Sequence, residues 1–268
     1  MNALRKLAGL LLLALMVAGS VSGQSGQQAP PTPAPAEPAA PPVNQEEEKD
    51  YQAFFETARM DAPRQAQLGE AFVVKYPESR YRESVYTRLT NVYLSLGDVK
   101  KLAAAGGKAL EINPDNVDVL SVMAYALPRD IRPSELDAPQ RLKKVEEYST
   151  HAIELLNQMV KPEPLSEEDF TRAKNEKLSM AYSGLGLVQF RRADYTGMAE
   201  SMELATTLTA TPDPSDFYLL GISYQQLRRF SDAATTFGKC AAMDWQNQDA
   251  CKQSRAEAEK QAALQPKN

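Results

Sequence analysis

The residues of this chain whose chemistry is easiest to interpret are its only two cysteines, Cys240 and Cys251. Cys240 stands at a small-residue position that faces the following predicted helix, and Cys251 lies about one turn into that helix. In an oxidising compartment such a pair predicts a disulfide, and closing this short loop would stabilise the fold by about 3 kcal/mol. Two free buried thiols are the alternative. A zinc site would need further ligands, which the distant His151 does not supply.

Catalytic patterns are missing from the rest of the sequence. It has no glycine-rich phosphate loop and no serine flanked by glycines in a nucleophile elbow. The single histidine, His151, is expected on an exposed helix surface. Acidic clusters at 46–48, 146–147 and 167–169 fit helix starts or solvated helix faces. We therefore predict a protein that is not an enzyme and that needs no cofactor and no metal.

Composition favours a helical protein with protein partners. The chain has 268 residues, of which 43% are hydrophobic, enough for a substantial core. Aromatic residues are sparse and β-branched runs are short, so nothing argues for a sheet. The formal net charge of -5 argues against nucleic acid and against anionic membrane surfaces as general partners.

Residues 1–23 have the pattern of an export signal. Arg5 and Lys6 precede an uncharged apolar run at 7–17, and small residues follow at 18–23. The run is shorter than the roughly 20 residues that a comfortable membrane span needs. No cysteine stands directly after it, at 18–23, which argues against a lipoprotein. We expect a periplasmic or secreted bacterial protein, with an inner-membrane anchor formed by an uncleaved signal as the alternative.

A low-complexity linker is predicted at 24–45. It is rich in glutamine and then in proline and alanine, so it has little to bury and its prolines bias it towards extended conformations. It would hold the folded part away from a membrane or wall, or it is a tail without a selected role. A short disordered tail is predicted at 263–268.

The stretch 83–116 is the unit that the folded region repeats. Large apolar residues fall three and four apart, at Tyr86, Leu89 and Tyr93. This spacing predicts a helix with one apolar face. Gly97 suits the left-handed residue that ends a helix, and Asp98 suits the cap of the next one. A second apolar stripe then runs to Pro114, so two short antiparallel helices are predicted that cannot bury their apolar faces alone.

This stretch resembles a tetratricopeptide repeat (TPR), a 34-residue helix pair. Five residues stand at the offsets that the repeat asks for: Tyr86, Leu89, Tyr93, Ala109 and Pro114. Thr90 replaces the usual glycine and Gly106 the usual aromatic residue. The resemblance implies an all-α solenoid of about four TPR-like helix pairs plus a C-terminal capping helix, of the type found in exported bacterial envelope proteins.

The TPR-like domain is expected at 46–262. Its approximate repeats and cap are 46–80, 83–116, 117–160 with an insertion at 128–137, 179–212, 214–247, and 248–262. The segments at 179–212 and 214–247 carry the strongest matches, including Leu185-Gly186 and Leu220-Gly221. The helix of the first of these should begin early, near Glu167.

Two details of the third repeat are also predicted. Pro128 should end its first helix at Leu127, because proline cannot continue the hydrogen-bond ladder. Asp137 should open its second helix, with Gln140 completing a capping box.

The resemblance further implies a concave groove lined by one face of each first helix. Carried over by repeat register, its candidate partner-binding residues are Arg88, Asn91, Ser95, Leu187, Arg191, Tyr218, Ile222 and Gln225. Mixed polar, aromatic and arginine positions suit an extended peptide or a partner helix. Thr87 stands where a carboxylate-clamping lysine would be, so that type of groove is not expected.

The sequence thus predicts a monomeric or weakly oligomeric interaction scaffold or adaptor of the bacterial cell envelope. Its partner is a protein, not nucleic acid, and it contacts no membrane beyond the export signal. Two alternatives stay open. The first is a structural subunit of an envelope assembly, of the outer-membrane biogenesis or cell-division type. The second is an accessory subunit of an envelope enzyme.

Overall fold

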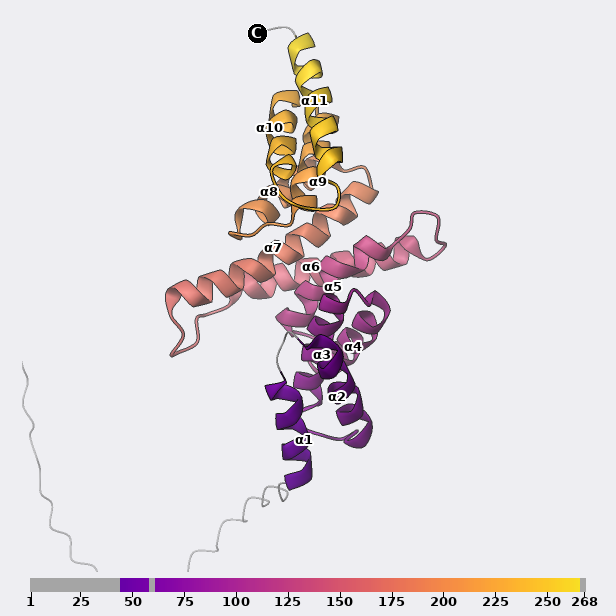
Figure 1. The fold of residues 1–268 in the computed structure, drawn as a ribbon, viewed down its shortest axis with the longest axis vertical. Helices are drawn as coiled ribbons and strands as arrows, with labels where there is room; N and C mark the ends of the chain where they lie inside the picture. Colours follow the sequence, from indigo (N-terminus) through magenta and orange to yellow (C-terminus); the bar gives the residue numbers. More distant parts are fainter. Residues whose placement is uncertain (1–43, 58–60, 266–268) are drawn as a thin grey trace, which may run out of the picture. The chain divides into compact units, whose positions relative to one another are not determined.

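The computed structural model describes residues 44–57 and 61–265, which contain eleven α-helices and no strand (Figure 1). The helices are α1 (Gln45–Glu56), α2 (Ala62–Lys75), α3 (Arg82–Leu96), α4 (Val99–Ile112), α5 (Val117–Asp130), α6 (Ala138–Gln158), α7 (Glu167–Arg191), α8 (Tyr195–Thr207), α9 (Pro214–Gln226), α10 (Phe230–Ala241) and α11 (Gln248–Leu264). The predicted signal at 1–23, the linker up to residue 43 and the end of the tail lie outside these residues.

The order of packing follows the order of the chain. Each helix from α1 to α10 packs against the next, and α5 also contacts both α3 and α7. The first helices of the second, third and fourth pairs, α3, α5 and α7, therefore lie against one another, while α11 closes the series on α10. Within the described residues this arrangement is five helix pairs plus a closing helix, and it confirms the prediction of an all-α solenoid. It has one pair more than the predicted four or so, because the degenerate segment at 46–80 also forms a pair, α1 with α2.

The turns form as their residues predict. Gly97 adopts φ 69°, the left-handed conformation that ends α3. The side chain of Asp98 then accepts a hydrogen bond from the backbone N–H of Lys101 at 2.9 Å, which caps α4. Ser166 caps α7 in the same way through the N–H of Asp169 at 3.0 Å. The early start of α7 near Glu167 is therefore confirmed.

Pro128 does not end α5, contrary to the prediction. The helix continues to Asp130 with Pro128 inside it. Because Pro128 stands in the last turn, its missing N–H removes only the bond that the carbonyl of Ala124 would accept. The backbone of α7 lies against that carbonyl at Gly184. A proline this close to a helix end therefore does not stop the helix.

The predicted capping box of α6 is also wrong. Asp137 is the N-cap residue, but its side chain makes no capping hydrogen bond. Its backbone has φ -92° and ψ 1°, which is not the extended conformation that lets an N-cap side chain accept a hydrogen bond from the first turn of the helix. The loop before it supplies another contact, since the N–H of Ala138 donates to the carbonyl of Glu135 at 3.1 Å.

Small residues let paired helices approach closely. Gly186 of α7 lies against Met202 of α8, and Gly221 of α9 lies against the ring of Phe237 in α10. Both Met202 and Phe237 are fully buried. The glycines of the two Leu-Gly pairs therefore serve packing, as the repeat pattern predicts.

Candidate partner-binding groove

Three of the predicted groove residues, Arg88, Asn91 and Ser95, line one hollow of about 750 Å³. They lie on a single face of α3, since residues three and four apart share a helix face. The same helix contributes five more lining residues: Glu83, Ser84, Thr87, Val92 and Leu94. We call this space the first hollow.

Other helices supply the opposite walls of the first hollow. Phe55 comes from α1, Asp118 from the first turn of α5, and Lys177 from α7. Lys177 pairs with Asp118 at 3.0 Å, which ties α7 to α5. The side-chain amide of Asn116 donates to Glu83 at 3.0 Å and to Thr87 at 2.9 Å, tying the start of α5 to α3. The walls are therefore cross-linked by polar contacts.

The first hollow combines an aromatic surface with a cation. Arg88 lies over the ring of Phe55, with 4.4 Å from the guanidinium carbon to the ring centroid, and it donates to the carbonyl of Thr57 at 3.4 Å. Phe55 itself stays 48% exposed, which is unusual for phenylalanine in a folded domain. The pair presents an apolar face and a positive charge side by side.

Asn91 is the polar residue of this wall with the most unused capacity. It is exposed, and its amide nitrogen donates one hydrogen bond, to the carbonyl of Thr87 at 3.0 Å. Its side-chain oxygen accepts none from the described residues. An asparagine with a free donor and a free acceptor suits the backbone of an extended peptide.

A second hollow of about 480 Å³ adjoins the first, because Leu94 lines both. We define the second hollow by its lining side chains from α5, α7 and the segment before and into α9: Tyr125, Glu176, Met180, Asp213 and Asp216. The two hollows therefore follow the first helices α3, α5 and α7, which is the face that the repeat register predicts for the groove.

The predicted groove residues of α7 lie in neither hollow. Leu187 is buried, 7% exposed, within the core that α7 to α11 share. Arg191 is exposed at the end of α7 and donates to the carbonyl of Ile131 at 3.4 Å. The repeat register that correctly locates lining residues on α3 therefore fails on α7, where it selects one core residue, Leu187, and one residue that contacts a loop, Arg191.

The predicted residues of α9 also lie apart from the hollows. The ring of Tyr218 packs against Phe237, with centroids 5.7 Å apart, and against Trp245. Gln225 reaches across to α11, where its side-chain nitrogen lies 3.3 Å from the side-chain oxygen of Gln261. Ile222 is half-buried in the same core. The closing helices therefore already contact part of this face.

A buried polar network borders the second hollow and was not predicted from the sequence. Ser183 of α7 donates to Asp216 Oδ1 at 2.6 Å, and Arg129 Nη2 donates to the same atom at 3.2 Å. Tyr125 donates its hydroxyl to Asp213, while the Arg129 guanidinium lies 3.8 Å from the centroid of the Tyr125 ring. The network links α5, α7 and α9.

Two residues of this network, Tyr125 and Arg129, could have been identified from the repeat register. Tyr125 and Arg129 stand one 34-residue repeat after Asn91 and Ser95. They thus stand at the corresponding positions of α5, the first helix of the third pair, for which the prediction named no groove residues. Asp213 and Asp216 carried no comparable signal.

Burial and charge act in opposite directions on the two carboxyl groups of the network. Burial raises the pKa of Asp216 to about 6, against the opposing effects of Arg129 and Ser183. Burial also favours a higher pKa for Asp213, but hydrogen bonds from Tyr125 and Ser215, together with Arg129, hold it below its ordinary value. Asp216 is therefore the carboxyl group that titrates closest to neutral pH within this network.

The remaining residues singled out in the sequence lie elsewhere. The Sγ atoms of Cys240 and Cys251 lie 2.03 Å apart and their Cα atoms 6.0 Å apart, which supports the predicted pairing. His151 is half-buried, with Nε2 2.7 Å from Asp115 Oδ1 in the turn between α4 and α5. Within residues 44–57 and 61–265, no group of histidine, cysteine and acidic residues could hold a metal ion.

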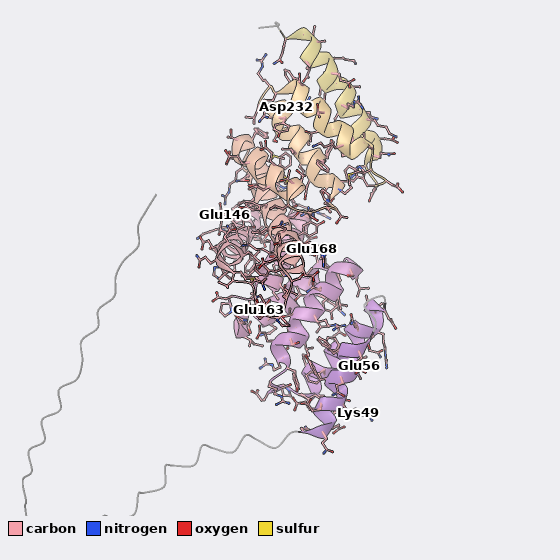
Figure 2. All side chains as sticks on the ribbon, turned by 90° about the vertical axis from the view of Figure 1, so that its left-hand side faces the viewer. Lys49, Glu56, Glu146, Glu163, Glu168 and Asp232 are labelled. Atoms are coloured by element: carbon pink, nitrogen blue, oxygen red, sulfur yellow. A yellow bond between two sulfur atoms is a disulfide. The ribbon has the colours of Figure 1, made fainter. Side chains whose placement is uncertain are left out.

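The acidic clusters have structural contacts. Glu146 on α6, labelled in Figure 2, accepts two hydrogen bonds from Arg192, at 2.6 and 2.8 Å. Hydrogen bonding to Arg192 holds the pKa of Glu146 below its ordinary value. The clusters at 46–48 and 167–169 fall in the first turns of α1 and α7. Among the described helices, none has the length and apolar character to cross a membrane.

No protein-family model matches the chain, and no curated protein matches it. Among solved structures, PilW, a widely conserved type IV pilus biogenesis factor, is 16% identical, with a TM-score of 0.52 over 82% of this chain and 93% of its own. TTC0263, a thermophilic TPR protein of Thermus thermophilus, is 15% identical, with a TM-score of 0.48 over 81% of this chain and 100% of its own. The chain therefore has the all-α solenoid fold of a TPR-type protein.

Proposed function

We propose that this protein is a non-enzymatic scaffold of the bacterial cell envelope that binds an extended segment of a partner protein along the two hollows of α3, α5 and α7. The observation that carries the proposal is the first hollow, where Phe55, Arg88 and Asn91 combine an exposed aromatic ring, a positive charge and an amide group whose oxygen accepts no hydrogen bond from the described residues. Such a surface offers both side-chain contacts and backbone hydrogen bonds to a peptide.

An extended segment suits this surface better than a catalytic substrate does. The lining of the first hollow is divided between polar and apolar side chains, and two of its charged residues, Lys177 and Asp118, form an ion pair. Leu94 lines both hollows, so we infer that a ligand reaching from one to the other passes over Leu94 and is longer than a small molecule.

Three observations support an envelope location. The sequence of residues 1–23 has the pattern of an export signal. The cysteine pair of α10 and α11 suits an oxidising compartment. PilW, whose fold is similar, is a pilus biogenesis factor. We infer a periplasmic or secreted protein, acting as a monomer or weak oligomer.

A photo-crosslinking residue placed at Ser95 in the full-length chain tests the groove. Ser95 is exposed and lines the first hollow, whereas Glu200 is exposed on α8 and lines neither hollow, so it is the matched control. In envelope extract we expect a defined protein adduct from position 95 and none from position 200. Asn91→Ala should weaken that adduct by about 3- to 10-fold, the effect of one or two lost hydrogen bonds.

The groove assignment is wrong if both positions capture the same proteins, or if Asn91→Ala leaves the adduct at position 95 unchanged. A second candidate, a fixed subunit of an envelope assembly, is favoured by the likeness to PilW. If that candidate is correct, the protein should co-purify with a large complex, and Asn91→Ala should leave that complex intact.

A further inference from the structure

The second hollow is acidic, unlike the first. Three of the side chains that line it are carboxylates, Glu176, Asp213 and Asp216, and none of the lining residues is basic. Arg129 lies behind the two aspartates, 3.2 Å from Asp216 and 3.7 Å from Asp213, so it offsets one negative charge of the three. A net negative hollow remains.

Asp216 has hydrogen-bonding capacity that the fold does not use. Its side chain is only 2% exposed. Both of its side-chain hydrogen bonds, from Ser183 and from Arg129, end on Oδ1. Oδ2 accepts no hydrogen bond from the described residues. Among the described residues, the fully buried side-chain atoms without a partner are Ser121 Oγ and Gln189 Oε1, and Asp216 Oδ2 is not one of them. Because Asp216 lines the hollow, Oδ2 is an acceptor that a donor entering the hollow can use.

Glu176 adds a second unmatched acid at the exposed side of the hollow. It lies on α7, is exposed, and makes no hydrogen bond or ion pair with the described residues. Apolar side chains line the space beside these acids: Leu94, Met180, Pro212 and Pro214. The hollow therefore offers apolar contact along one part and negative charge at another.

We propose that the second hollow is the recognition subsite for one basic side chain, lysine or arginine, of the partner segment. The ammonium or guanidinium donates to Asp216 Oδ2, with Asp213 and Glu176 as the other carboxylates facing it. Its methylene stem packs on Leu94 and Met180, as the stems of long basic side chains do on apolar surfaces. This subsite rests on the proposed function, because it assumes that a peptide segment occupies the adjoining hollows.

The structure also indicates where in the segment the basic residue falls. Leu94 lies at the junction of the two hollows, and Arg88 with Phe55 lies in the first. A segment that fills both hollows therefore carries its basic residue at the end held by α5, α7 and α9, away from Arg88.

A random peptide library displayed on phage and selected on the immobilised full-length chain tests the subsite. We expect lysine or arginine to be enriched at one position of the selected peptides. The double variant Glu176→Gln, Asp213→Asn should lose that enrichment. Asparagine keeps the capping contact that Asp213 makes with the N–H of Ser215, at 2.8 Å, so α9 should keep its start.

Glu168→Gln is the matched control, since Glu168, labelled in Figure 2, lies in the first turn of the same helix. It lines neither hollow. This variant should retain the enrichment. Circular dichroism and thermal melting check that each variant is folded, and the single variant Glu176→Gln, at an exposed position, gives a second reading if the double variant is unstable.

The best selected peptide is then compared with its analogue in which norleucine replaces the basic residue. We expect the parent protein to bind the analogue at least about 10-fold more weakly, and the double variant to bind both alike. If the selected peptides bind less well to Asn91→Ala but show no enrichment of lysine or arginine, the subsite proposal is wrong and the proposed function still holds. Selected peptides insensitive to both Asn91→Ala and Glu176→Gln, or no selected peptide at all, would overturn both.

Discussion

Gly184 of α7 lies directly against the backbone carbonyl of Ala124 in α5: a Cβ atom at position 184 would lie 2.2 Å from that oxygen. The contact joins the two central first helices of the solenoid. It falls at the carbonyl that Pro128 leaves without a helical hydrogen bond, so a Cα–H group of Gly184 can approach it.

Gly184→Ala should destabilise the protein by about 3 kcal/mol or more, because the obstacle is backbone and cannot rotate away. Denaturant unfolding measures the change. Gly107→Ala is the control: position 107 is in the interior of α4 with nothing within 4 Å of an added Cβ, so the variant should be stabilised by about 0.5–1 kcal/mol. Equal effects at the two positions would contradict the close contact.

The two Leu-Gly glycines should respond differently to the same substitution. A Cβ at Gly221 would meet the ring of Phe237 at 2.5 Å, while one at Gly186 would meet the Cε of Met202 at 2.6 Å. The buried ring is rigid, whereas methionine can change rotamer. Gly221→Ala should therefore be the more destabilising, by about 1–3 kcal/mol. The free energies of unfolding of both variants decide this, and an equal or reversed order would count against it.

Reduction of the Cys240–Cys251 pair should lower the free energy of unfolding by about 3 kcal/mol, the value that the chain-entropy model gives for a loop of this size. Thermal melting with and without dithiothreitol measures the loss. A double variant, Cys240→Ala with Cys251→Ala, is the control and should melt alike in both conditions. A parent chain that is indifferent to reductant, with free thiols detected by alkylation, would argue for the unpaired alternative.

Asp216 should make stability depend on pH. Its pKa is raised from 3.8 to about 6 in the folded state, so the folded protein holds a proton between these values that the unfolded chain has lost. The stabilisation is complete below the unfolded pKa and disappears as pH rises through 6. Relative to Asp216→Asn, the parent should therefore gain up to about 3 kcal/mol as pH falls from 7 to 4.

Denaturant titrations of both proteins at pH 4, 5, 6 and 7 measure this difference. The loss of contacts with Arg129 and Ser183 adds an offset to the variant, but the offset does not change sign with pH. A difference between the two proteins that stays constant from pH 4 to pH 7 would contradict the raised pKa of Asp216.

Local signals in the sequence were sufficient for the helix pairs. The spacing of Tyr86, Leu89 and Tyr93, followed by Gly97 and Asp98, determines a helix, its end and the cap of the next one from residues that are neighbours in the chain. Such signals repeat along the domain, so the fold class could be predicted without knowing any contact between distant residues.

The candidate site was predictable only where it depends on one helix. Arg88, Asn91 and Ser95 share a face of α3, so register alone brings them together. The Tyr125–Asp213 contact joins residues 88 apart in sequence, and no local pattern reports such a pair. Leu187 matched the register but is buried by later helices, which is a consequence of packing between repeats.

The uninterrupted course of α7 has a final consequence for selectivity. Lys177 lines the first hollow and Met180 the second, and they are three residues apart on one helix, about 4.5 Å along its axis. Because α7 is continuous between these two residues, it fixes the distance between the two contact points of any peptide bound across it. If a bound peptide carried one extra residue between the two side chains that contact these points, one of those side chains would be displaced by about 3.3 Å and would no longer reach its hollow.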